Sequence, residues 1–353
     1  MMSDCTRPPL TCKIPNVRIA GLTCSVPEDV RTNSHFAEKF GDGVDQVTKM
    51  TGILERRIAP DSVTTSDLCH HAAMHLLDKM NVDRNEIGAL IFVSQTPDYR
   101  LPATACELQA RLNLSQNVAA FDVNLGCSGY TYGLWLAASL IASGSVGKIL
   151  LLVGDTISKI VAEDDRATAL LFGDCGTATL LERSDTSEPM SFVLGTDGRG
   201  AHNLIVAEGA FRCVSNRDER NHNPSDKLFM EGTEIFNFTL RAVPALVSEL
   251  KNLALQPETD FDFYLFHQAN SFMIKHLVKK AKIQIEKAPI NIDSFGNTSS
   301  ATVPLLLVTK CRDTILSSDG GHFGMFGFGV GYSWAGCASR IQQLGCADLV
   351  VLK

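Results

Sequence analysis

The sequence predicts an α/β protein, because short apolar runs of strand character alternate with segments of helical periodicity along the chain. The chain has 353 residues, which is more than one typical domain and enough to bury a large core. Apolar residues make up 45% of the sequence and charged residues 20%, so the composition is that of a folded globular protein rather than a disordered one.

Five short apolar runs predict buried strands, at residues 17–24, 89–94, 118–123, 149–153 and 263–266. Apolar residues recur with helical spacing at residues 66–80, 103–112 and 271–282, and an almost wholly apolar helix over residues 128–142 is expected to end at Gly144. We also expect a hairpin over residues 167–182, with its turn between Gly173 and Gly176, and a glycine-punctuated strand region over residues 326–338.

The polar stretch 214–227 has no hydrophobic period and contains Pro224, so we expect a surface loop there. The α/β alternation resumes after this loop. Two halves of similar organisation, which meet around residues 183–190, would account for the pattern.

The charge and the apolar segments exclude several classes of protein. The net charge of −7 argues against general nucleic-acid binding, which needs a basic surface. The first fifteen residues lack the apolar core of a secretory signal, and the most apolar stretches, 134–142 and 149–153, are too short to cross a bilayer. We therefore expect a soluble cytoplasmic protein without membrane insertion.

The eleven cysteines contain no CxxC pair, which argues against a disulfide framework or a structural zinc site. Most are expected to be small buried residues in a reducing compartment. His70, His71 and His75 form an HHxxxH pattern, but no nearby glutamate or distant third ligand is evident, so a solvent-facing helix is favoured over a metal site. The glycine-rich run 320–331 lacks GK[ST] and favours a strand that lines an active site over a phosphate-binding loop.

Cys127 stands out among the cysteines because it lies where a predicted strand gives way to the apolar helix at 128–142. Amide groups at a helix N-terminus favour a thiolate, and we expect this position to make the cysteine nucleophilic at neutral pH. The alternative is a structural cysteine on a glycine-rich turn.

Two further polar residues complete a possible catalytic set. His267 directly follows the predicted strand 263–266, and Asn297 lies between a glycine and small hydroxyl residues. Each has a structural alternative, a hydrogen-bonded core histidine and a Gly-Asn-Thr turn. Together with Cys127 they supply a nucleophile, a base and a neutral donor, which is the set needed to attack a thioester and stabilise an enolate.

The order of these residues resembles the Cys–His–Asn triad of the ketoacyl-acyl-carrier-protein synthase III family of condensing enzymes. Three further segments resemble that family's motifs: TGILERR at 51–57, DRATALLFGD at 165–174 and GFGVGYSW at 327–334. The likeness runs from about residue 17 to residue 338. It implies a thiolase-like fold of two similar α/β halves in a five-layered α-β-α-β-α arrangement, with the cysteine in residues 1–186 and the histidine and asparagine in residues 187–353.

The triad separates this family from its relatives. Elongating ketoacyl synthases use two histidines, thiolases use a second cysteine, and hydroxymethylglutaryl-CoA synthases use a glutamate. Chalcone-type synthases share the triad but usually have longer chains, so Asn297 and the chain length both favour the type III group.

The resemblance implies an acyltransferase in which Cys127 takes an acyl group from a thioester. The backbone N–H groups of Cys127 and Val330 would form the oxyanion hole. A malonyl thioester would then lose carbon dioxide while His267 and Asn297 donate hydrogen bonds to the enolate oxygen. No bound cofactor or metal is implied, and the substrates are thioesters of coenzyme A or phosphopantetheine.

The resemblance also implies a homodimer that acts on acyl-CoA or on acyl-carrier protein. Its acyl pocket would involve Leu101, Phe172 and Gly329, with Leu101 in place of a phenylalanine that reaches across the dimer in relatives. Lys275, Lys279 and Lys280 would form a docking patch for an acidic carrier, the alternative being a solvated basic face.

Three departures bear on the role. This chain has Phe272 where relatives usually have an arginine, and Gln46 and Met50 where bacterial initiating enzymes often have a tryptophan and an arginine. Both fatty-acid initiation and a specialised acyl pathway therefore stay open. Two other hypotheses are transfer of the acyl group to an oxygen or nitrogen acceptor, and a catalytically silent partner subunit, against which the intact triad argues.

Overall fold

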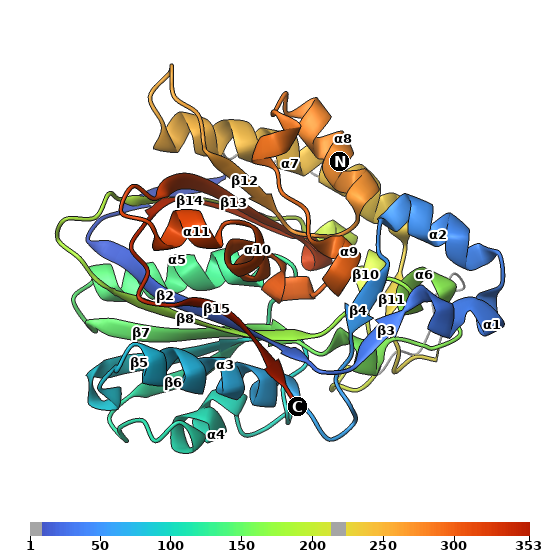
Figure 1. The fold of residues 1–353 in the computed structure, drawn as a ribbon, viewed down its shortest axis with the longest axis horizontal. Helices are drawn as coiled ribbons and strands as arrows, with labels where there is room; N and C mark the ends of the chain where they lie inside the picture. Colours follow the sequence, from blue (N-terminus) through green and yellow to red (C-terminus); the bar gives the residue numbers. More distant parts are fainter. Residues whose placement is uncertain (1–8, 213–223) are drawn as a thin grey trace.

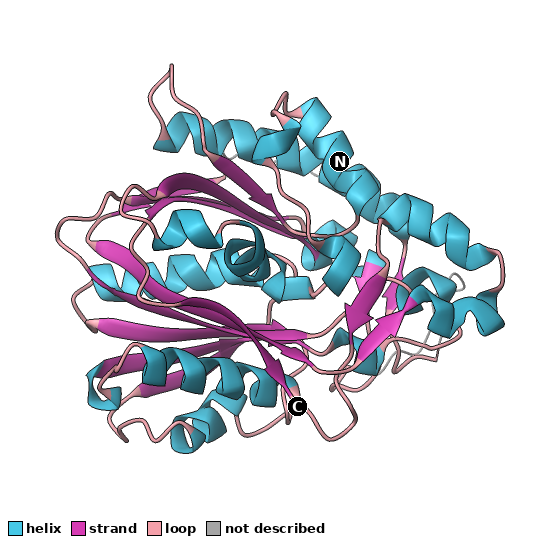
Figure 2. Cartoon of the chain, viewed as in Figure 1, coloured by secondary structure: helices cyan, strands magenta, loops and turns pink. Residues whose placement is uncertain are grey.

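The computed structural model describes residues 9–212 and 224–353, which form stacked layers of helices and sheets (Figure 1). Helices α7 (Gly232–Ala254) and α8 (Ser271–Lys280) cover one outer face, and α3 (Thr65–Lys79) and α4 (Thr104–Arg111) cover the other. Two sheets lie between them and enclose α5 (Gly129–Ala142), α10 (Thr302–Lys310) and α11 (Arg312–Leu316) (Figure 2). This five-layered arrangement confirms the predicted fold class.

The six-stranded sheet has the order β15 (Ala347–Leu352), β2 (Val17–Pro27), β8 (Cys175–Arg183), β7 (Lys148–Asp155), β5 (Ile87–Val93) and β6 (Ala119–Val123). The five-stranded sheet has the order β1 (Leu10–Ile14), β9 (Met190–Thr196), β14 (Ser333–Ile341), β13 (Gly321–Gly329) and β12 (Phe263–Phe266). Strand β5 runs parallel to both β6 and β7, and β12 runs parallel to β13.

The two sheets exchange their outermost strands. Strand β1, from the beginning of the chain, pairs with β9, and β15, from its end, pairs with β2. The chain passes from one sheet to the other between β1 and β2, between β8 and β9 around residue 186, and between β14 and β15. The division of the chain at this residue into two halves, 1–186 and 187–353, stays a prediction.

The remaining elements flank the layers, on the right of Figure 1. They are α1 (Ala37–Phe40), α2 (Gly43–Thr51), α6 (Arg166–Ala169), α9 (Ile292–Phe295) and four short strands: β3 (Val30–Thr32), β4 (Glu55–Arg57), β10 (Leu204–Ile205) and β11 (Phe229–Met230).

Coverage on both faces explains why the central elements are so apolar. Every residue of β7 after Lys148 is buried, since helices pack on both sides of the sheet. Helix α5 touches both sheets, so Leu134, Ala137 and Ile141 are all buried, and the helix ends before Gly144, which has a φ of 78°. Within the described residues, no helix has both the length and the apolarity needed to span a membrane.

The five predicted strands and four predicted helices are confirmed, each within a few residues of its expected bounds. The predicted hairpin at 167–182 is wrong, because α6 and the single strand β8 occupy that segment, and β8 pairs with β2 and β7. The region 326–338 is instead a true hairpin, in which β13 and β14 pair antiparallel. Most of the loop expected at 214–227 falls outside the described residues.

Candidate active site

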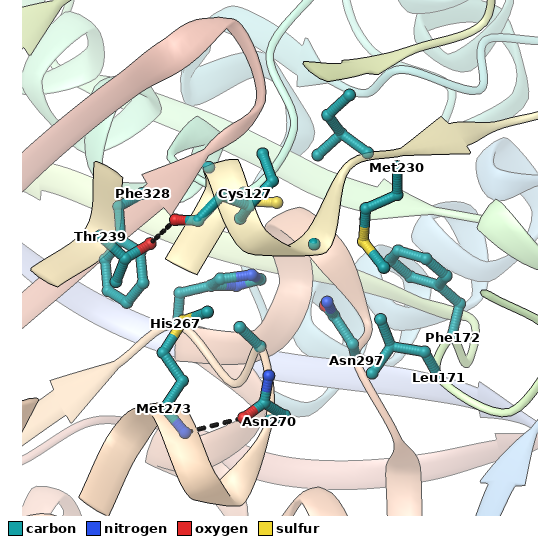
Figure 3. Close-up of a pocket in the computed structure, with 15 residues that line it drawn as sticks. Cys127, Leu171, Phe172, Met230, Thr239, His267, Asn270, Met273, Asn297 and Phe328 are labelled. Carbon is teal, nitrogen blue, oxygen red and sulfur yellow. Dashed lines mark hydrogen bonds between the residues drawn. The ribbon is translucent and has the colours of Figure 1, made fainter. Parts of the chain in front are cut away.

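Cys127 lies in the turn between β6 and α5, with its side chain at a cavity (Figure 3). The next residue, Ser128, has its hydroxyl 2.7 Å from the hydroxyl of Ser333 on β14, which ties this turn to the other sheet. Gly329 packs directly against the sulfur, because a Cβ atom at that position would lie 2.8 Å from Sγ. The turn that carries Cys127 is therefore held by β13 and β14 of the five-stranded sheet.

His267 follows β12 directly and is 2% exposed. Its backbone N–H donates to the carbonyl of Phe326 over 2.8 Å, and its Nδ1 lies 2.8 Å from the hydroxyl of Thr302. The ring of Phe328 stands perpendicular to the imidazole, with ring centroids 5.6 Å apart. The imidazole is thus held on one side by a hydroxyl and on another by an aromatic ring.

Asn297 is held by backbone bonds to a distant segment. Its N–H donates to the carbonyl of Leu171 over 2.9 Å, and its carbonyl accepts from the N–H of Gly173 over 3.1 Å. Its side-chain Oδ1 accepts from the backbone N–H of Ser299 over 2.9 Å. Because Oδ1 is engaged in this way, the Nδ2 group is the one that can donate to a ligand.

The structure brings Cys127, His267 and Asn297 to one cavity of about 80 Å³, although they are far apart in the sequence. In Figure 3 their three side chains point toward a common space. Two predicted pocket residues, Phe172 and Gly329, line the same cavity. The other walls are mainly apolar, from Leu171, Leu204, Met230, Ile235, Met273 and Phe328.

Burial raises the pKa of Cys127 to about 11. Amide contacts at this position do favour the thiolate, as expected from the sequence, but loss of water outweighs them, so the pKa lies above its usual range rather than below it. Backbone N–H groups of Val330 and of Cys127 itself contact the sulfur and act in the opposite direction, lowering that pKa. These are the two groups proposed from the sequence as an oxyanion hole.

Burial also lowers the pKa of His267 to about 3, so the imidazole is neutral near pH 7. A neutral thiol thus faces a neutral imidazole and a neutral amide. Such a set can donate hydrogen bonds to a developing oxyanion without placing a permanent charge in an apolar cavity.

The other predicted residues lie outside the cavity. Leu101 is 78% exposed, in the loop between β5 and α4, and does not line the cavity of its own chain. Lys275, Lys279 and Lys280 are exposed on α8, where Lys280 donates to the backbone carbonyl of Leu240 over 2.6 Å. The roles assigned to these residues stay predictions.

Several site residues had no recognisable signal of their own in the sequence. Thr302 and Phe328 contact His267, but each of them is distant from it in the sequence. Ser299 fixes the side-chain amide of Asn297, and this contact depends on a tight local turn. Thr302 and Ser299 do lie in the hydroxyl-rich run after Asn297, which is the one signal that could have indicated them.

The histidine pattern on α3 has a structural explanation. His71 Nδ1 lies 2.9 Å from the hydroxyl of Ser25, and His75 Nε2 lies 2.8 Å from a carboxylate oxygen of Asp348. The expectation of a solvent-facing run is therefore only partly right, since these side chains are half-buried. His75, Cys346 and Asp348 lie close enough together to hold a metal ion, but Lys79 and Arg312 already form ion pairs with Asp348.

Known proteins resemble this chain along nearly its whole length. Family models described as 3-oxoacyl-[acyl-carrier-protein (ACP)] synthase III, and as its C-terminal part, match residues 121–198 and 251–341. A putative 3-oxoacyl-[acyl-carrier-protein] synthase 3 from Campylobacter jejuni is 34% identical over 95% of this chain and 96% of its own length.

Two solved structures have the same fold. A 3-oxoacyl-(acyl-carrier protein) synthase from Burkholderia xenovorans LB400 is 46% identical, with a TM-score of 0.95 over 98% of this chain and 99% of its own. The priming β-ketosynthase of the R1128 polyketide pathway is 26% identical, with a TM-score of 0.80 over 96% of this chain and 99% of its own.

Proposed function

This chain belongs to the 3-oxoacyl-[acyl-carrier-protein] synthase III family of condensing enzymes, and from that premise we propose how its residues carry out the condensation. The single observation that supports the proposal most is that Cys127, His267 and Asn297 line one cavity. A thioester carbonyl placed in that cavity would have the sulfur as nucleophile and neutral donors on its other side.

In the loading step, Sγ of Cys127 attacks the carbonyl carbon of an acyl thioester. The oxyanion that forms accepts hydrogen bonds from the N–H groups of Cys127 and Val330, which already point at the sulfur. The carbon–sulfur bond to the carrier then breaks, and the carrier thiolate takes up the proton that the Cys127 thiol has lost. An acyl-enzyme remains.

In the condensation step, a malonyl thioester enters and loses carbon dioxide, and its thioester carbonyl becomes an enolate. The enolate oxygen accepts hydrogen bonds from Nδ2 of Asn297 and Nε2 of His267. Nε2 carries the hydrogen when the hydroxyl of Thr302 turns from the carbonyl of Ser299, 3.1 Å away, and donates instead to Nδ1 at 2.8 Å. The carbanion carbon attacks the acyl carbonyl, and Cys127 leaves as a thiolate that is then protonated.

The identity of the substrates is the finer part of the proposal. The names of the relatives favour an acyl-carrier thioester as acceptor, and the priming ketosynthase favours a specialised pathway beside fatty-acid initiation. We propose acyl-CoA or acyl-carrier protein as donor, a homodimer without bound cofactor, and a cytoplasmic location. The exposed lysines 275, 279 and 280 would attract the acidic carrier.

Covalent loading tests the nucleophile. We expect wild-type protein incubated with a series of acyl-CoA and acyl-carrier thioesters to gain the mass of one acyl group, and the Cys127→Ala variant to gain none. Intact-mass spectrometry measures both. Cys106 is exposed, so Cys106→Ala is a matched control that should load as the wild type does. Acylation that persists in Cys127→Ala would contradict the assignment.

A variant of Asn297 distinguishes the loading step from the decarboxylation step. We expect Asn297→Ala to reduce carbon dioxide release from malonyl-carrier by about 100-fold, because one enolate donor is lost, while loading of Cys127 changes much less. Labelled carbon dioxide and intact mass measure the two rates. Equal loss of both would count against this role.

The same assay tests the alternative acceptor. An acyl-enzyme that releases no carbon dioxide from malonyl-carrier, but passes its acyl group to an alcohol or amine, would favour acyl transfer to oxygen or nitrogen over carbon–carbon bond formation.

A further inference from the structure

Asp155, the last residue of β7, is a fully buried carboxylate at the junction of the two halves of the molecule. No lysine or arginine bonds to it among the described residues; it accepts hydrogen bonds from neutral groups instead. Oδ1 accepts from the N–H of Gln95 over 2.7 Å and from the hydroxyl of Ser94 over 3.2 Å. Oδ2 accepts from the hydroxyl of Ser300 over 2.6 Å and from its N–H over 3.2 Å.

The Oδ2 side leads to Asn297. Ser300 belongs to the short 3₁₀ helix Ser299–Ala301, and the N–H of Ser299 donates to the side-chain oxygen of Asn297. Asp155 therefore holds the turn whose first residue orients the catalytic amide.

The Oδ1 side leads to Cys127. Gln95 follows β5, and its side-chain oxygen packs against Gly126, where a Cβ atom would come within 2.1 Å of it. Gly126 immediately precedes Cys127. A single carboxylate is thus bonded to one segment that packs beside the nucleophile and to another that carries the enolate donor.

We propose that Asp155 is a positioning residue that fixes the Asn297 turn relative to Cys127 and thereby supports the decarboxylation step. This inference rests on the proposed condensation. A buried carboxylate is costly to desolvate, and burial raises the pKa of Asp155. These donors, together with the side chain of Ser299, offset that cost and hold the two segments in one arrangement.

Asparagine is the informative replacement at this position. Each carboxylate oxygen of Asp155 faces donors, so the side-chain amide in Asp155→Asn would direct its own NH₂ hydrogens at either the Gln95 pair or the Ser300 pair. Whichever side it faces, the link between the two segments is broken while the volume of the side chain is kept.

The experiment compares Asp155→Asn and Ser300→Ala with the wild type in two single-turnover assays, acylation of Cys127 by acyl-CoA and carbon dioxide release from malonyl-carrier. Ser300→Ala removes the 2.6 Å bond alone and keeps the proposal testable if Asp155→Asn does not fold. The charge of Asp155 raises the pKa of Cys127, so Asp155→Asn changes the nucleophile as well, whereas Ser300→Ala keeps that charge. We expect decarboxylation relative to acylation to fall by about 10- to 100-fold in Asp155→Asn and by less in Ser300→Ala, with acylation within about 3-fold of wild type in Ser300→Ala.

Asp348→Asn is the matched control, since Asp348 also accepts several bonds but lies on the edge strand β15, away from the cavity. Asp348→Asn should leave both the acylation rate and the rate of carbon dioxide release at their wild-type values. Equal loss of acylation and decarboxylation in the Asp155 and Ser300 variants, or loss of neither, would overturn the positioning role alone. Wild-type protein that acylates but releases no carbon dioxide would overturn the proposed function, and this inference with it.

Discussion

Two opposing influences act on the sulfur of Cys127, at the scale of single residues. Burial removes water from it, whereas the N–H groups of Cys127 and Val330 stabilise negative charge there. Burial has the larger effect, so Cys127 is a thiol near pH 7. The same N–H groups become more valuable when an oxyanion forms near them, which is the behaviour expected of groups that favour a transition state over the ground state.

The raised pKa of Cys127 predicts a specific pH dependence of alkylation. With a pKa of about 11, the thiolate fraction rises about tenfold for each pH unit between 7 and 9. We therefore expect the rate of iodoacetamide alkylation at Cys127 to rise by that factor, without a plateau below pH 9. Peptide mass spectrometry follows this cysteine among the others. A plateau near pH 7 would instead indicate an activated thiolate.

The residues proposed as catalytic could be found in the sequence because each has a local signal and their order and surrounding motifs resemble one family. Cys127 precedes an apolar helix, His267 follows a strand, and Asn297 lies in a run of small polar residues. Asp155 could not be assigned in this way. Its partners are 60 and 145 residues away, and which donors meet a carboxylate at a strand end depends on the packing of the two halves.

At the scale of elements, the β13–β14 hairpin depends on glycine where it passes the nucleophile. Within β13, Gly329 lies against the sulfur of Cys127, and Gly327 lies against the backbone of Ser128. Side chains at these positions would push the strand away from the turn that carries the nucleophile. The glycine-rich run 320–331, favoured from the sequence as a strand beside an active site, is that strand followed by a 3₁₀ turn.

Gly329→Ala tests this close approach. Its Cβ would lie 2.8 Å from both Cβ and Sγ of Cys127, so we expect acyl loading to fall by about 100-fold through displacement of the nucleophile. Intact-mass kinetics measure the loss. Gly147→Ala is the matched control, because a Cβ there meets no atom within 4 Å. Loading at the wild-type rate in Gly329→Ala would contradict this, because it would mean that displacement of the sulfur does not slow acylation.

The failed hairpin prediction has a physical cause at the same scale. The segment at residues 170–172 is apolar and adjacent to glycine, as hairpin strands are. Its backbone, however, forms hydrogen bonds with Asn297, which is distant in the sequence, rather than with a neighbouring strand. Local pattern indicates that a segment is extended and buried, but it does not indicate its partner. The elements with a local period, the helices above all, were therefore predicted more closely than the pairings.

At the scale of the whole molecule, the cavity that holds Cys127, His267 and Asn297 is lined by segments from both sides of residue 186. Cys127 comes from the turn beside the six-stranded sheet, and His267 follows a strand of the five-stranded sheet. The exchange of β1 and β15 between the sheets adds covalent continuity to this junction. Neither part of the chain alone would supply all three proposed catalytic residues, so the position of one part against the other sets the distances between them.

Leu101 raises the question whether the site also needs a second copy of the chain. It is 78% exposed, and its loop leads into α4, which packs on β6, the last strand at one edge of the six-stranded sheet in the described part of the chain. The resemblance to the family implies that this residue enters the acyl pocket of a partner subunit. We therefore expect light scattering to show a dimer.

Mixed dimers test the crossing directly, with Leu101→Trp chosen to shorten the acyl pocket that it enters. When one subunit carries both Cys127→Ala and Leu101→Trp and the other is wild type, the one intact nucleophile faces the tryptophan of its partner, so we expect preference for shorter acyl groups. When Leu101→Trp instead lies on the subunit with the intact Cys127, loading should match the wild type. Intact-mass spectrometry of each acyl-enzyme gives the preference. The reverse pattern would place Leu101 in the pocket of its own chain, and a monomer would remove the partner from the site altogether.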